Sequence, residues 1–115
     1  MVKILIRRLM RDCEVDEHFF YEDTDIPSKK IYDALYIDSV FSEWMLNHFL
    51  SRIGIKQYDL IKYMHLNPKH QEFMYQRILV EMRRRVKAWR EVVYQRGREK
   101  RFQERLAAKQ KNSEV

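Results

Sequence analysis

No glycine or proline interrupts the sequence between Pro68 and Gly97. Proline removes a backbone hydrogen-bond donor and glycine weakens a helix, so a long stretch without either favours one continuous helix. The whole chain of 115 residues holds only two Gly and two Pro. Sandwiches and barrels need many turns that these residues mark, so we expect long helices with few breaks instead of an all-β fold.

Apolar residues make up 45% of the chain, which is enough to build a core, and they recur at helical spacing. We therefore predict an all-α fold, a small helical bundle of three to four helices that pack through residues 31–93. A long basic C-terminal helix extends from this bundle to about residue 110, and its core-facing stripe ends near residue 94. This divides the chain into a helical domain over 1–96 and a basic helical or frayed extension over 97–115.

The segment after the first expected helix is acidic. Residues 12–25 hold seven Asp or Glu and no Lys or Arg. We expect a helix over 2–13, followed by an acidic loop over about 14–28 that contains a short helical turn. Phe19 and Phe20 are expected to fold back from this loop as anchors onto the core.

Capping residues indicate where the next helices begin and end. Ser28 is a suitable N-cap for a helix that runs to Gly54, a typical C-terminal stop. Asp38–Ser39 offers a second N-cap, so two shorter helices are an alternative. Asn67 is expected to cap the last helix, with Pro68 at its first position.

Positive charge is concentrated towards the C-terminus. Residues 83–115 hold 12 basic and 4 acidic residues, whereas residues 1–82 hold 11 basic and 13 acidic residues. Arg outnumbers Lys in the basic part, and the planar guanidinium binds phosphate through two parallel hydrogen bonds. A basic helix can lie along a nucleic-acid backbone and release its condensed counterions. The side chains expected to contact phosphates are Arg83, Arg84, Arg85, Lys87, Arg90, Arg96, Arg98, Lys100, Arg101 and Arg105.

Residues 54–78 resemble the helix-turn-helix of small DNA-binding regulators. Gln57 stands where the first helix of that motif opens, and Asn67–Pro68 stands where the recognition helix starts. Leu60, Met64 and Leu66 match its buried positions. The resemblance implies possible base readout by Lys69, His70, Gln71 and Glu72.

The same residues also depart from that motif. Ile61 occupies a place where the family has a small residue, and His65 replaces the usual Gly of the turn. Gln71 occupies a place where a buried Val or Ile is expected. The alternative is an ordinary tight connection between two helices of a bundle.

No catalytic signature is found in the sequence. Gly54 and Gly97 stand alone, so there is no Gly-rich phosphate loop, and no Ser or Cys lies in a nucleophile motif. His65 and His70 are five residues apart and do not share a helix face. We therefore predict a protein that is not an enzyme, with no cofactor and no metal site.

Cysteine usage and hydropathy favour a cytoplasmic, intracellular protein. The single Cys13 rules out an internal disulfide, and the first residues are interrupted by Arg, unlike a signal peptide. No apolar run approaches the ~20 residues that span a bilayer, so we expect no membrane partner.

These observations favour a small nucleic-acid-binding or regulatory protein, with DNA or RNA as the partner. The first alternative is a protein-interaction subunit or regulator that docks on a larger complex through its helical surface around Trp44 and its acidic loop. A further alternative is a homodimer whose heptad-like seam is Met74, Ile78, Met82, Val86, Trp89 and Val93. Nucleic-acid binding predicts a continuous exposed stripe of Arg side chains with few carboxylates near it.

Overall fold

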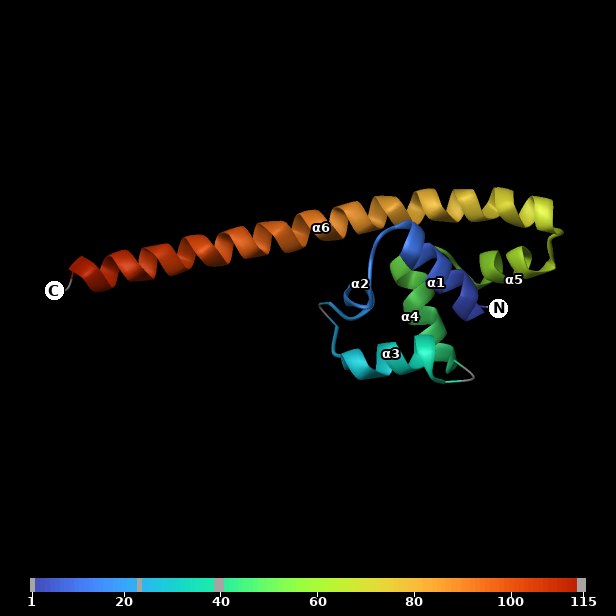
Figure 1. The fold of residues 1–115 in the computed structure, drawn as a ribbon, viewed down its shortest axis with the longest axis horizontal. Helices are drawn as coiled ribbons and strands as arrows, with labels where there is room; N and C mark the ends of the chain where they lie inside the picture. Colours follow the sequence, from blue (N-terminus) through green and yellow to red (C-terminus); the bar gives the residue numbers. More distant parts are fainter. Residues whose placement is uncertain (1, 23, 39–40, 114–115) are drawn as a thin grey trace.

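A computed structural model describes residues 2–22, 24–38 and 41–113 (Figure 1). This part of the chain forms helices and no strand, which confirms the predicted all-α class. No helix within it combines the length and apolar character that crossing a membrane requires. In chain order the helices are α1 (Val2–Asp12), α2 (His18–Tyr21), α3 (Ser28–Tyr36), α4 (Glu43–Ile53), α5 (Gln57–His65) and α6 (Pro68–Ser113).

Helix α6 sets the shape of the molecule. It has 46 residues, which is about 69 Å at 1.5 Å per residue, and the whole molecule measures 71 × 27 × 20 Å. The helices α1, α4 and α5 lie against its first part, with α2 and α3 beyond them, and its last part projects alone (Figure 1). We call residues 2–93 the head and residues 94–113 the arm. The head is a cluster of five short helices on one long helix, so the predicted bundle of three to four helices is not what is observed.

The core of the head lies between α6 and the short helices. Each short helix contributes buried apolar side chains, including Leu9 from α1, Leu35 from α3 and Phe49 from α4. Helix α1 is thus part of the core, which extends beyond the predicted range of 31–93. From α6 the buried side chains are Tyr75, Ile78, Leu79, Met82 and Val86.

The buried stripe of α6 ends earlier than the sequence predicts. Trp89 is partly buried against Phe19, with ring centroids 5.5 Å apart, but Val92 and Val93 are exposed because no helix lies over them. The homodimer seam predicted along the same stripe is also wrong. Three of its six members, Ile78, Met82 and Val86, are already buried in the chain's own core.

The acidic loop is fixed to the core as predicted. Phe19 and Phe20 of α2 are buried, and the ring centroid of Phe20 lies 4.8 Å from that of Phe49. The Arg52 Nε donates to the backbone oxygen of Phe19 at 2.9 Å, and the ring of His48 bonds the backbone oxygen of Phe20 at 2.6 Å. These contacts hold the loop on α4.

The expected helix from Ser28 to Gly54 is split into α3 and α4. This confirms the two-helix alternative, although Ser39 of the proposed second cap lies outside the described residues. Ser28 is the first helical residue of α3 and Pro27 occupies its N-cap position, so the predicted cap is displaced by one residue.

Two predicted helix boundaries are confirmed by their backbone geometry. Gly54 ends α4 with a φ of +100°, a conformation that glycine adopts without a steric penalty. The Asn67 Oδ1 accepts a hydrogen bond from the backbone N–H of His70 at 3.0 Å, which caps the start of α6.

Candidate nucleic-acid interface

Six of the ten predicted phosphate-binding side chains lie on one face of α6. With Tyr94 placed between Arg90 and Arg98, each residue of the series follows the previous one by three or four positions. Residues spaced in this way share one face of a helix. All these side chains are exposed, and no carboxylate of α6 occupies a position in the series. We call this face the basic stripe: Arg83, Lys87, Arg90, Tyr94, Arg98, Arg101 and Arg105.

The other four predicted cations face other directions. The Nη2 of Arg84 and the Nε of Arg85 contact one carboxylate oxygen of Glu81 at 2.6 and 3.3 Å. These hydrogen bonds hold the pKa of Glu81 below its usual value. Arg96 and Lys100 continue the line of the buried α6 positions into the arm. The structure therefore divides the ten residues and does not gather them on one surface.

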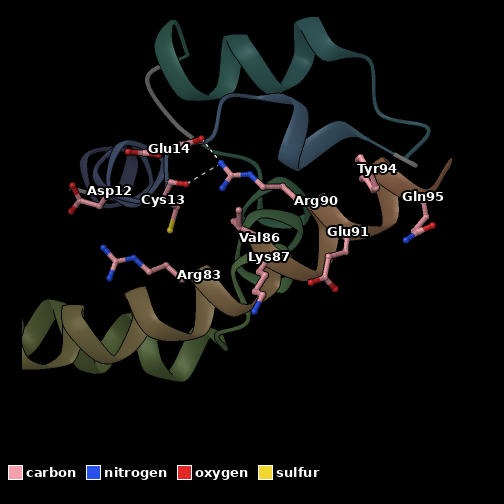
Figure 2. A pocket seen from close by; sticks show the side chains of 10 residues that line it. All are labelled: Asp12, Cys13, Glu14, Arg83, Val86, Lys87, Arg90, Glu91, Tyr94 and Gln95. Carbon is pink, nitrogen blue, oxygen red and sulfur yellow. Dashed lines mark hydrogen bonds between the residues drawn. The ribbon is translucent and has the colours of Figure 1, made fainter. Parts of the chain in front are cut away.

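Arg90 differs from the rest of the basic stripe because it binds the head. Its Nη2 donates to the backbone oxygen of Glu14 at 2.6 Å and makes a longer contact of 3.4 Å to that of Cys13 (Figure 2). Both oxygens lie just after the end of α1, where backbone carbonyls lack helical partners and attract a cation. Arg90 therefore holds the end of α1 against α6, with fewer donors left for a phosphate.

A hollow of about 590 Å³ lies beside Arg90, between the end of α1 and α6 (Figure 2). Three cations and three carboxylates line it, so it has no large net charge. Burial raises the pKa of the Cys13 thiol, which keeps this side chain protonated and poorly nucleophilic. The charged lining residues are Asp12, Glu14, Arg83, Lys87, Arg90 and Glu91.

Glu72, a predicted base-reading residue, is instead part of an ion-pair network in the head. The Arg8 Nη2 lies 2.9 Å from the Glu72 Oε1, and the Arg8 guanidinium lies 3.6 Å from the ring centroid of Tyr75. The Tyr75 hydroxyl donates to the carboxylate of Asp12. The hydrogen bond from Arg8 lowers the pKa of Glu72, and the bond from Tyr75 lowers that of Asp12. The ion pair between Arg8 and Glu72 thus links α1 to α6.

The other three predicted base-reading residues are only partly free. Lys69 and His70 are exposed at the start of α6. The Nε2 of Gln71 donates to the backbone oxygen of Tyr63 at 3.0 Å, so this side chain links α5 to α6. The structure does not bring the four residues together on one exposed surface.

The α5–α6 hairpin matches the helix-turn-helix pattern in part. Leu60 is buried, as the resemblance predicts, but Met64 is 41% exposed and Leu66 only partly buried. Ile61, at the position where the family has a small residue, is 55% exposed and so makes no close helix contact. The second helix of the hairpin, α6, has 46 residues and is far longer than the recognition helix of a helix-turn-helix.

Sequence reasoning missed the roles of Arg8 and Arg90. Both bind partners more than sixty residues away in the chain, and no local pattern indicates such contacts. The basic stripe, by contrast, left a signal in the sequence: each member follows the previous one by three or four residues. That spacing separates the six stripe cations from the other four.

This chain was compared with protein families, curated proteins and solved structures. No family model matches this chain, and neither a curated protein nor a solved structure shows significant similarity to it.

Proposed function

We propose that this protein is a small, non-enzymatic nucleic-acid-binding protein that holds the phosphate backbone of DNA or RNA with the basic stripe of α6. The observation that supports the proposal is the exposed series of six cations on one helix face. From Arg83 to Arg105 this face is about 33 Å long, close to one turn of a B-form duplex. A straight face of this length spans about one turn, so its cations can reach phosphates on both sides of a groove.

The chemistry of the stripe suits phosphate. Five of its six cations are Arg, whose guanidinium forms paired hydrogen bonds to phosphate oxygens. Exposed Tyr94 lies within the series and offers a ring on which a base can stack. Contacts to the backbone carry no sequence information, so we expect binding with weak sequence preference.

The test is binding of the full chain to labelled duplex DNA and to a structured RNA, over about 50 to 300 mM salt. Replacing Arg98 and Arg101 by Gln is expected to weaken binding about tenfold and to lower the salt slope by about two. The matched control replaces Arg96 and Lys100 by Gln. It removes the same charge from the same stretch of the arm but spares the stripe, and should weaken binding much less.

Two results would count against the proposal. Equal losses in the two variants would mean that net charge, and not the stripe, is responsible. No binding to either polymer at low salt would reject nucleic-acid binding altogether.

A second candidate function is docking on a larger protein complex. It is favoured by large apolar side chains that the head leaves exposed near α3 and α4, among them Tyr32, Tyr36 and Trp44. Single exposed aromatics are common on protein surfaces, so this observation carries less weight than the stripe. Absence of binding to DNA and RNA makes this second candidate the leading one.

A further inference from the structure

A second face of α6 remains uncovered along the arm and the last turns of the head. Its positions also alternate between intervals of four and three residues, which is the spacing of a coiled-coil seam. Val92 is 46% exposed, Phe102 58% and Leu106 41%. No other described helix lies beside the arm (Figure 1). We call it the arm seam: Ala88, Val92, Gln95, Glu99, Phe102 and Leu106.

We propose that the arm seam binds the same face of a second copy of this chain, with the two helices antiparallel. The face is self-complementary when a two-fold axis passes near residue 97. Leu106 of each copy then lies opposite Ala88 of the other, and Phe102 lies opposite Val92. Each large apolar side chain therefore meets a smaller one, which lets two helices pack closely.

The central polar residues decide the direction of the two helices. In a parallel pair each Glu99 would face its own copy, and two like charges in a seam repel. In the antiparallel pair Gln95 faces Glu99, so that an amide N–H can donate to a carboxylate. Only the antiparallel arrangement pairs these two groups.

Charges at the edge of the seam are also complementary in the antiparallel pair. Glu91 comes next to Arg105 of the other copy, and the two-fold axis makes this contact twice. Arg98 on one edge and Arg96 on the other each approach their own copy near the axis, and the two Glu91–Arg105 contacts are set against this repulsion. These charge contacts favour a second copy over an unrelated helix.

Dimerisation also explains how a lone arm remains helical. The arm packs against no other described helix of the chain, and most helices in proteins are stabilised by packing along one face. A two-fold axis perpendicular to the plane of both helices places the two basic stripes on the same side of the pair. The dimer does not depend on the proposed function, and it would place Arg83, Lys87 and Arg101 of both copies on one side of the pair.

The first experiment is sedimentation velocity of the full chain across the micromolar range. We expect a concentration-dependent species of twice the monomer mass of 14.3 kDa. Leu106→Asp places a charge in the seam and should weaken dimerisation by about tenfold or more. Ala108→Asp is the matched control, because it makes a similar charge change two residues further on, on the opposite face of the arm. It should leave dimerisation nearly unchanged.

Charge reversal then tests the antiparallel pairing. Glu91→Arg and Arg105→Glu should each weaken the dimer, and the chain carrying both changes should recover most of the lost affinity. A wild-type chain that stays monomeric throughout the range overturns the proposal. Equal effects of Leu106→Asp and Ala108→Asp, or no recovery in the double charge reversal, overturn the proposed seam. These mass measurements involve no nucleic acid, so their outcome is independent of the binding test above.

Discussion

The head part and the arm part of α6 form one continuous helix, but they are stabilised in different ways. In the head, α6 buries five large side chains against the short helices. In the described part of the arm no side chain is buried, and charged residues are frequent on the surface. The two parts of α6 can therefore be altered independently of each other. Changes in the head should alter folding, whereas changes in the arm should alter what the protein binds.

The largest expected effect comes from the core of the head. Phe49→Ala removes a fully buried ring that contacts Phe20 and Phe41, with ring centroids 4.8 and 5.4 Å away. It should lower the free energy of unfolding by about 3–5 kcal/mol. At a protein concentration low enough to keep the chain monomeric, Phe102→Ala in the arm should lower it by less than about 0.5 kcal/mol. Urea unfolding measures both, and similar losses would mean that the arm is part of the folded core.

A smaller effect is expected where the basic stripe touches the head. Arg90→Gln removes the hydrogen bonds to the backbone oxygens of Cys13 and Glu14, so the free energy of unfolding should fall by about 1 kcal/mol. Arg101→Gln should leave it nearly unchanged, because the Arg101 Nε bonds only a carbonyl of its own helix, that of Gly97. Equal stability of the two variants would show that Arg90 does not hold α1 in place.

A further prediction concerns pH and the contact between α1 and α6. The hydrogen bond from Tyr75 lowers the pKa of Asp12 from its usual 3.8 in the folded state. Its contribution to stability is therefore complete above that value and is lost as the pH falls through the lower, folded pKa. Asp12→Asn should be less stable at neutral pH and should lose less stability on acidification. Urea midpoints measured from pH 7 down to strongly acidic pH test this, and parallel curves for the two proteins would contradict it.

The smallest effect on overall stability is expected at Gly97. An added Cβ there meets no atom within 4 Å, so Gly97→Ala should strengthen the arm helix by about 1 kcal/mol without a clash. Far-ultraviolet circular dichroism should show more helix, while the unfolding midpoint of the head stays unchanged. Gly54→Ala is the contrasting change, because its φ is +100° and the added Cβ would lie 2.2 Å from the Arg85 Nε. A rise in stability there would contradict the role assigned to this turn.

Much of the local structure was predictable from the sequence, because short-range signals determine it. The run without Gly or Pro after Pro68 predicted α6, and Gly54 and Asn67 marked helix ends correctly. The end of the buried stripe was predicted wrongly, since Val93 continues the apolar pattern although no helix lies there to cover it. The spacing of the basic residues separates the stripe, but the pairing of Arg8 with Glu72, 64 positions further along the chain, left no local signal. Burial and ion pairing of this kind are set by the tertiary fold, which periodicity alone does not describe.

The uninterrupted course of α6 has a mechanical consequence. Each residue of an α-helix turns the chain by about 100°. The number of residues between two side chains of α6 therefore fixes the angle between the directions in which they point. One residue inserted between Val93 and Arg98 would rotate the distal cations by that angle, away from the direction in which Arg83 and Lys87 point. Seven inserted residues would bring them almost back into line. The proposed phosphate contacts therefore require a fixed number of residues between Lys87 and Arg98, as well as the basic residues themselves.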